Sequence, residues 1–419
     1  MITRLQTTFE KYPRQFWLMF VGMLISTIGS SMIWPFLLIY VSERLNAPLT
    51  AIASLLTLNS AMGLLSSFLG GPIIDRFGRK WIMAASLLAN GCAYLFMGNA
   101  STLPQFAILM AITGAVNPLY RIGADAMMAD LLPQEKRIDG YALMRLSNNL
   151  GISIGPAVGG FIAASSYSLA FYCAAVGMSL YSLLLVIFAH ETLPSKQSDQ
   201  IYHPSEKIPQ KERFGGYLTI LKDTPFISFI LSFTLVSICA SLIWILLPVY
   251  ATQIFKVPKQ LYGFIPATNA IMVVTLQLFV TRLTKRFPTL PVVSVGAFFY
   301  AIAVGSVALM SSFWGYWACM VVMTLGELII VPTSSTYIAN LAPIDMRGRY
   351  MSFYTLTWGV ASGIGPVFGG FLSDTFGPKT IWLGGAVAGG LGVIFFQILA
   401  QRARLAKAEE STQIAMTDS

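Results

Sequence analysis

The chain reads as a series of long apolar stretches that are separated by short polar segments. A transmembrane helix needs about 20 mostly apolar residues, and twelve stretches approach or exceed that length. Their predicted bounds are 16–41, 49–71, 80–98, 103–131, 138–164, 167–190, 225–253, 259–284, 289–311, 313–341, 347–374 and 378–401. This pattern predicts an all-α integral membrane protein with twelve transmembrane helices.

The second half of the chain repeats the first half at a constant offset of 210 residues. The matched positions are Trp34 with Trp244, Tyr40 with Tyr250, Pro133 with Pro343, Arg137 with Arg347, and the GPxxGG segment 155–160 with 365–370. Each half then holds six spans, and because six is even both halves enter the membrane from the same side. We therefore expect two six-helix bundles that rock around a substrate site at their seam.

Polar segments divide this plan into parts. Residues 191–215 are rich in charges and proline, as is typical of a flexible linker, and 217–222 could form a short interfacial helix. The predicted parts are an amino-terminal tail (1–15), a first bundle (16–190), the linker (191–215), a second bundle (216–402) and a carboxy-terminal tail (403–419). We expect the last tail to be disordered.

Composition supports a membrane protein. The chain is 55% hydrophobic and 11% charged, whereas a soluble domain carries about 25% charged residues. The net charge of +9 could suggest a nucleic-acid partner. If both termini are cytoplasmic, however, 21 of the 27 Lys and Arg residues fall on the cytoplasmic side, as the positive-inside rule requires. We expect a multi-pass protein of the bacterial cytoplasmic membrane whose partner is the lipid bilayer, not nucleic acid.

Several kinds of chemistry have no signature in this sequence. The four cysteines all lie in apolar spans, where the expected role is packing. Neither a phosphate-binding GxxxxGK[ST] loop nor a Cys/His set with metal spacing occurs. The sequence therefore predicts no enzyme, no cofactor and no metal site.

Four charged residues lie deep in the predicted spans: Arg121, Asp125, Arg145 and Glu327. Each costs about 2.5–3.5 kcal/mol on insertion scales, so each needs a reason. Arg121 and Asp125 are one helical turn apart on one face, and Arg145 should lie at a similar depth. They could form a network that binds substrate, with Asp125 also exchanging protons, or the network could be purely structural.

Glu327 is the charged residue that most favours a coupling role. Span 10 contains no basic residue. The position that matches Glu327 in the first half of the repeat is the neutral Asn117. Low-dielectric surroundings favour the protonated form of a carboxyl group. Glu327 could thus take up a proton near neutral pH and release it when its surroundings open to water. It could instead attract a cationic substrate, or remain protonated in a structural hydrogen bond.

Aromatic side chains could complete a substrate cavity, because aromatic faces hold amphipathic cations. They could also face lipid or anchor the helices at the interface. The predicted cavity residues are Trp34, Trp244, Arg121, Asn117, Tyr120, Arg145, Tyr354 and Trp358. Met127 and Met128 are expected to pack rather than to bind a soft metal.

Three segments resemble the major facilitator superfamily, and within it the twelve-span drug:proton antiporters. The loop after span 2 reads GPIIDRFGRK over 71–80, which is similar to the superfamily's G-x-x-x-D-R-x-G-R-[RK] loop. Span 5 carries G-x-x-x-G-P-x-x-G-G over 151–160, the antiporter type, and span 10 has Gly326-Glu327 followed by Pro332. The resemblance covers nearly the whole chain, but the family's usual Arg and Gln-Gly pattern in span 4 is not matched cleanly.

The resemblance implies that the first loop is a conformational latch. Asp75 would face the positive amino-terminal end of span 11, near Arg347 to Met351, and Arg79 would pair with Asp130. The implied latch residues are Gly71, Asp75, Arg76, Gly78, Arg79 and Asp130. Together they would hold the cytoplasmic side closed in the outward-open state. The alternative is a basic loop that only sets topology.

The glycines of span 5 lie on one helix face and allow backbones to approach closely. This packing motif comprises Gly151, Gly155, Pro156, Gly159 and Gly160. Pro156 adds a kink that neighbouring helices must accommodate. The face could pack across the seam between the halves and limit leak, or serve for helix packing alone.

These observations predict proton-coupled efflux of small amphipathic or cationic organic compounds, with the small molecule and protons as partners and a monomer as the expected state. The alternative within the same mechanism is export of a metabolite, sugar or lipid. A non-transporting receptor would bind ligand without counterflow, and a membrane enzyme would form product. Neither has a supporting signature in the chain.

Overall fold

The computed structural model describes residues 11–193, 217–343 and 346–417, and these residues are overwhelmingly helical. In the first half the long helices are α2 (Arg14–Leu45), α3 (Leu49–Phe77), α4 (Arg79–Met97), α5 (Leu103–Leu131), α6 (Gln134–Ser165) and α7 (Tyr167–Phe188). In the second half the long helices are α10 (Thr224–Val249), α12 (Phe264–Thr284), α13 (Thr289–Val307), α14 (Phe313–Leu341), α15 (Arg347–Phe376) and α16 (Thr380–Thr417), and the short elements are α9 (Tyr217–Lys222), the π-helical η2 (Tyr250–Ile254) and α11 (Lys259–Tyr262). Every predicted span falls on one long helix or on two consecutive ones.

Nine of the described helical segments are long and apolar enough to cross a membrane. Three helices on predicted spans, namely α4, α6 and α15, are not among them. The reason is visible in their sequences, since α4 opens with two basic residues and the other two carry many polar and small residues. The fold is the twelve-helix membrane architecture that the apolar pattern predicts.

The internal repeat is visible in the helix bounds. Helices α4 and α5 correspond to α13 and α14 with both ends shifted by 210 residues. The packing repeats as well, because α4 contacts α5 and α7 as α13 contacts α14 and α16. A hydrogen bond follows the same offset. The Ser31 hydroxyl donates to the carbonyl of Gly151 at 2.9 Å, and the Ser241 hydroxyl donates to that of Ala361 at 3.2 Å.

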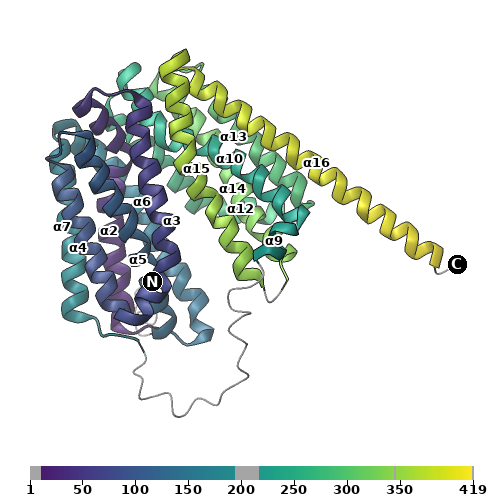
Figure 1. The fold of residues 1–419 in the computed structure, drawn as a ribbon, viewed down its shortest axis with the longest axis horizontal. Helices are drawn as coiled ribbons and strands as arrows, with labels where there is room; N and C mark the ends of the chain where they lie inside the picture. Colours follow the sequence, from purple (N-terminus) through teal and green to yellow (C-terminus); the bar gives the residue numbers. More distant parts are fainter. Residues whose placement is uncertain (1–10, 194–216, 344–345, 418–419) are drawn as a thin grey trace, which may run out of the picture. The chain divides into compact units, whose positions relative to one another are not determined.

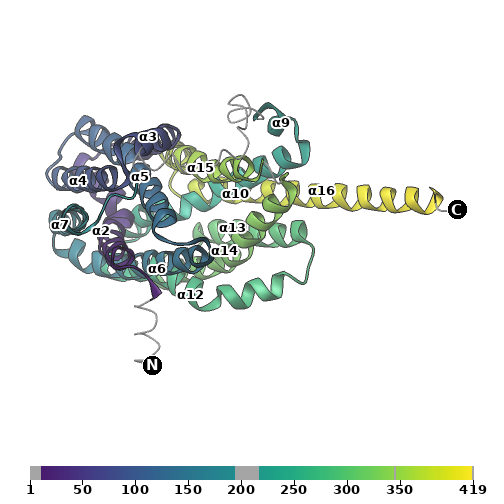
Figure 2. The same cartoon turned by 90° about the horizontal axis from the view of Figure 1, so that it is seen from below.

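The chain forms two compact units. Among the described residues, the first contains 11–193 together with 248–271, and the second contains 217–247 together with 272–343 and 346–417. In the first unit α2 packs on α6 and α7, α3 packs on α5, and α4 packs on α5 and α7; these helices run side by side in Figures 1 and 2. The short α11 from the second half of the sequence packs on α6 and so belongs to this unit.

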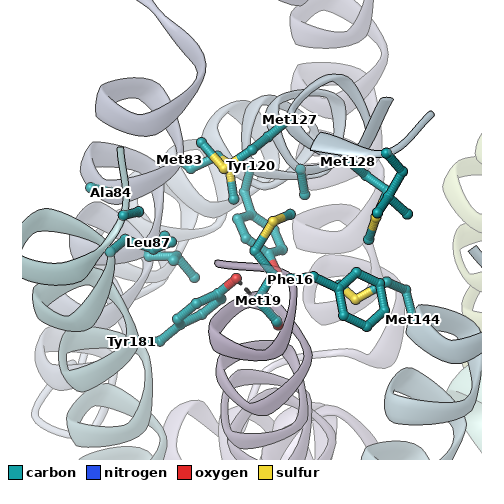
Figure 3. Close-up of a cluster of buried hydrophobic side chains, with 14 of the residues drawn as sticks. Phe16, Met19, Met83, Ala84, Leu87, Tyr120, Met127, Met128, Met144 and Tyr181 are labelled. Atoms are coloured by element: carbon teal, nitrogen blue, oxygen red, sulfur yellow. Dashed lines mark hydrogen bonds between the residues drawn. The ribbon is translucent and has the colours of Figure 1, made fainter. Parts of the chain in front are cut away.

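Methionine and aromatic side chains of α2, α4, α5, α6 and α7 pack together in a buried cluster of the first unit (Figure 3). Phe16 and Met19 of α2, Met83 of α4 and Tyr181 of α7 are each fully buried there. Met127 and Met128 of α5 belong to the same cluster. Unbranched methionine fills irregular gaps, so these two residues pack as expected.

Two predictions about polar segments have different outcomes. The short helix expected over 217–222 is present as α9. The tail was expected to be disordered, and this expectation is wrong: α16 continues to Thr417 (Figure 1). The segment after Arg402 is rich in Ala, Arg, Lys and Glu, which are strong helix formers, so the transmembrane helix extends into it. The linker from residue 194 onward lies outside the described residues.

Candidate functional site

The segment over 71–80, which comprises the end of α3, Gly78 and the start of α4, takes part in a compact ionic cluster at one end of the first unit. The Arg79 Nε lies 2.9 Å from Asp130 Oδ2, which is the ion pair that the family resemblance implies. A guanidinium nitrogen of Arg79 also lies 3.7 Å from Asp75. The Arg79 side chain is 11% exposed, whereas that of Asp75 is 71% exposed. Arg79 is thus fixed by Asp130, and Asp75 remains largely open to solvent.

The two glycines of this loop have different roles. Gly78 ends α3 with φ +90°, a conformation that favours glycine. Gly71 lies inside α3, where an added Cβ would meet nothing within 4 Å. Gly71 therefore has no close contact in this structure that a side chain would disturb. Arg76 stacks its guanidinium over the ring of the neighbouring Phe77 at 5.4 Å.

One acidic residue at this cluster was missed by the sequence analysis. Glu191, just after α7, accepts hydrogen bonds from the backbone N–H groups of Arg79 at 3.0 Å and Lys80 at 3.2 Å. The next residue, Thr192, donates its hydroxyl to Asp130 Oδ2 at 2.9 Å. In the sequence, Glu191 is the first residue of the predicted polar linker. The only pattern that could have indicated its role is a single acidic residue directly after an apolar span.

A polar stripe runs along α5 in the first unit. Asn117, Arg121 and Asp125 follow each other at intervals of four residues and are all exposed, so they share one helix face. Arg121 interacts electrostatically with Asp125. Tyr141 of α6 donates its hydroxyl to the carbonyl of Asp125 at 3.0 Å, which holds α6 beside this face.

Arg145 on α6 is also exposed. Within the described residues it forms no ion pair with Asp125 inside 4.0 Å, so the proposed three-residue network is not closed in this structure. Charged and amide side chains on this surface point to a wet environment, because charge facing lipid is costly.

The predicted cavity aromatics fall into three groups by the exposure of their side chains. Trp34 and Trp358 are 45% and 46% exposed, and Trp244 and Tyr354 are half-buried. Tyr120 is different, because it is 7% exposed and its ring packs edge-on against Tyr181, 6.0 Å away, inside the methionine cluster (Figure 3). This placement gives Tyr120 a packing role and does not support a place on a cavity wall.

The glycine face of α6 packs mainly within the first half of the sequence. A Cβ on Gly151, Gly155 or Gly159 would collide with Thr27, Ser31 or Met32 of α2. Two members of the motif also meet the second half: a Cβ on Gly160 would lie 2.7 Å from the carbonyl of Lys259, and a Cβ on Gly263 would collide with the carbonyl of Pro156. The glycines at 151, 155 and 159 therefore pack α6 on α2, whereas Pro156 and Gly160 lie against the segment around α11.

An ionic clamp lies at the opposite end of α2 from the segment over 71–80. Lys259 Nζ lies 3.0 and 3.2 Å from the two carboxylate oxygens of Glu43, and 4.2 Å from the ring centre of Tyr167. The Ser42 hydroxyl donates to Gln253 Oε1 at 3.1 Å. Residues 253–259 are thereby held on the ends of α2 and α7. No sequence pattern indicated this clamp.

Glu327 lies on α14 of the second unit and is partly buried. Its neighbour Gly326 sits against α13, where an added Cβ would lie 2.8 Å from both the Gly296 carbonyl and the Tyr300 ring. The buried Tyr300 interacts electrostatically with Glu327 and with Tyr354 of α15. This close packing brings the carboxyl group into a tyrosine-lined environment.

A hydrogen bond from α12 reaches the same level of α14. Gln277 Nε2 donates to the carbonyl of Leu328 at 3.1 Å. The surroundings of Glu327 are thus built by α12, α13, α14 and α15. Among the described residues, no group of three or more His, Cys, Asp or Glu side chains could hold a metal ion.

Comparison with known proteins adds independent information. The family model of the Major Facilitator Superfamily matches residues 19–366 and 229–415. A Na(+), Li(+), K(+)/H(+) antiporter of Planococcus maritimus is 26% identical over 389 residues, which is 87% of this chain and 89% of that protein. Multidrug resistance protein MdtH of Shigella dysenteriae is 24% identical over 335 residues, or 79% of each chain.

Solved structures with the same fold share little sequence with the chain. The nucleoside transporter NupG has a TM-score of 0.78 at 12% identity and covers 92% of this chain and 99% of its own. A bacterial homologue of the human lysosomal transporter Spinster has a TM-score of 0.74 at 14% identity and covers 92% and 96%. These likenesses establish the fold and carry no information on substrate.

Proposed function

Because the chain belongs to the Major Facilitator Superfamily and is a multi-pass membrane transport protein rather than an enzyme, we propose that it exports small amphipathic or cationic organic compounds in exchange for protons. Transport would proceed by alternating access, without a cofactor. Among its relatives are a protein named as a cation/proton antiporter and one named for multidrug resistance.

The observation that carries this proposal is the position of Glu327. It is the only charged residue of α14, and it lies in a packed, partly buried environment beside Tyr300. A carboxyl group in such a setting changes its proton occupancy when its solvation changes. A conformational change that opens or closes access to Glu327 would therefore load or release one proton. A cation that displaces this proton gives antiport.

The polar stripe of α5 supports a second part of the proposal. Asp125 is exposed among apolar helices and is balanced by Arg121 one turn away. We assign Asp125 an auxiliary proton or cation site and Asn117, Arg121 and Arg145 a place on the substrate-facing surface. Trp34, Trp244 and Trp358 would offer aromatic faces to a cation.

Monovalent metal cations are the second candidate substrate class. The relative that matches 87% of this chain is named as a Na(+), Li(+), K(+)/H(+) antiporter. Carboxylates such as Asp125 and Glu327 are hard oxygen ligands that suit such ions. The exposed tryptophans favour an organic cation over an alkali ion as the substrate, because oxygen ligands alone are enough to bind an alkali ion.

Proteoliposomes with an imposed pH gradient test the proposal. We expect addition of an organic cation, from a panel that also includes Na⁺, Li⁺ and K⁺, to dissipate the gradient only when the protein is present. Glu327→Gln should abolish this flux, while Glu43→Gln, which removes a carboxylate elsewhere, should retain proton coupling. Full coupled transport by Glu327→Gln would disprove the role of Glu327, and flux without a pH dependence would disprove antiport.

We further propose a location in the bacterial cytoplasmic membrane with both termini in the cytoplasm, and a monomeric state. The positive-inside distribution supports this orientation. The relatives that match the chain come from bacteria. On this orientation the latch loop lies at the cytoplasmic end of the first unit, and the Glu43–Lys259 clamp lies at its outer end.

A further inference from the structure

The first turn of α4 carries backbone N–H groups that its own sequence cannot satisfy. The first N–H groups of any helix lack partners inside the helix, and a side chain at the N-cap position normally accepts one of them. Here the N-cap is Gly78, which has no side chain and adopts φ +90°. Because this conformation favours glycine, α4 cannot cap itself.

Glu191 supplies the missing cap from 112 residues away. One carboxylate oxygen accepts from the Arg79 N–H at 3.0 Å and the other from the Lys80 N–H at 3.2 Å. An added Cβ at Gly78 would collide with this carboxylate. Gly78 is therefore needed both for its backbone conformation and for the approach of Glu191.

The adjacent residue reaches the ion pair of the latch. Thr192 donates its hydroxyl to Asp130 Oδ2, the same oxygen that faces Arg79 Nε at 2.9 Å. The preceding residue is fixed as well, because the side chain of Gln15 donates to the His190 carbonyl at 2.8 Å and accepts from its N–H at 3.1 Å. Residues 190–192 are thus held on α2, α4 and α5.

We propose that Glu191 and Thr192 are positioning residues of the latch: Glu191 neutralises the positive end of α4, and Thr192 orients the Asp130 carboxylate that holds Arg79. This arrangement leaves Asp75 available, since its side chain is 71% exposed. A favourable anion at a helix amino terminus also strengthens the helix. The inference rests on the proposed latch function of the loop over 71–80.

The contact itself is tested without transport, by thermal unfolding of purified protein. Glu191→Ala and Gly78→Ala should each lower the Tm. In a protein that already carries Glu191→Ala, adding Gly78→Ala should lower the Tm less than Gly78→Ala does in the wild type. The reason is that the carboxylate with which the new Cβ would collide is no longer present. Additive Tm shifts would show that Glu191 does not occupy the position beside Gly78 and would overturn the inference.

The effect on the latch is tested by thiol labelling of Asn117→Cys, an exposed position on α5, in a protein whose four native cysteines are replaced by alanine. Glu191→Gln and Thr192→Val should each raise labelling from the cytoplasmic side by about fivefold, the size expected from loss of one helix cap or of one hydrogen bond. Thr192→Ser keeps the hydroxyl, and Glu206→Gln removes another linker carboxylate. Both should label as the parent does.

Asp75→Asn is the reference variant that distinguishes failure of the proposed latch from failure of the positioning role of Glu191 and Thr192. If Asp75→Asn raises labelling while Glu191→Gln and Thr192→Val do not, the latch stands and the positioning role fails. If none of the three changes labelling, the latch itself is disproved and the inference falls with it. A lower Tm with unchanged labelling would mean that Glu191 has only a structural role, which also overturns the proposal.

Discussion

At the scale of single residues, the chain uses paired charges at both ends of the first unit. Arg79 is 11% exposed and contacts both Asp75 and Asp130. At the other end, Lys259 contacts Glu43, and both of these side chains are more exposed than that of Arg79. Exposed pairs contribute about 0–1 kcal/mol, whereas a buried charge that loses its partner costs more. The two pairs should therefore respond differently to substitution.

Neutralising Asp130 should destabilise the protein measurably. In Asp130→Asn the largely buried Arg79 loses its closest anionic partner, and we expect a loss of about 1–3 kcal/mol in unfolding free energy. Thermal unfolding in detergent measures the change. Glu43→Gln, which removes a more exposed carboxylate, is the control and should shift the midpoint less. Equal shifts would contradict the difference in burial.

Breaking the outer clamp should change accessibility more than stability. Lys259→Gln removes the ion pair with Glu43, so Ser42→Cys at the end of α2 should react faster with a membrane-impermeant maleimide added outside. Adding Glu43→Gln to Lys259→Gln should cause no further increase, because the shared contact is already lost. A further increase in the double variant would show that the two residues act separately.

At the scale of elements, close packing of α6 on α2 depends on small residues. A Cβ on Gly159 would collide with the backbone of Met32 in α2, whereas one on Gly390 of α16 would meet nothing within 4 Å. Gly159→Ala should therefore cost about 1–3 kcal/mol through overpacking. Gly390→Ala should be neutral or slightly stabilising, since alanine is the better helix former.

Unfolding midpoints of the two variants check this prediction side by side. They carry the same chemical change in transmembrane helices, so differences in helix propensity cancel. A Gly159→Ala protein as stable as Gly390→Ala would mean that α6 and α2 do not approach closely at this point.

Sequence patterns located the helices well because apolar length is a strong constraint in a bilayer. They could not locate features that depend on three-dimensional contact. The π-helical turn at Tyr250–Ile254 breaks the repeat with α2, where the matching segment is α-helical. The helical extension of α16 was missed because a polar segment after the last span was interpreted as a tail.

The candidate site was predictable only in part for the same reason. Arg121, Asp125 and Glu327 stand out because charge is rare in apolar spans. Tyr120 also stood out as an aromatic residue of span 4, yet it packs into the methionine cluster. Glu191 caps α4 from a distant position, and a contact over such a separation leaves no periodic signal in the sequence.

At the scale of the whole molecule, the two halves repeat their helix packing but not their charged residues. The Ser31 and Ser241 hydrogen bonds and the matching bounds of α4 and α13 preserve the duplicated framework. The acid of the proposed latch and the proposed coupling acid each occur in one copy, because the second-half counterpart of Asp75 is Lys285 and the first-half counterpart of Glu327 is Asn117. We infer that the framework supplies the motion and that these single-copy residues give it direction and coupling.

The most direct test of this account is proton release by the purified protein in weakly buffered detergent. Addition of a transported cation should release protons from the wild type, because cation and proton compete for Glu327, and should release none from Glu327→Gln that still binds the cation. Undiminished proton release from Glu327→Gln, or cation binding by the wild type with no proton release at any pH, would contradict the account.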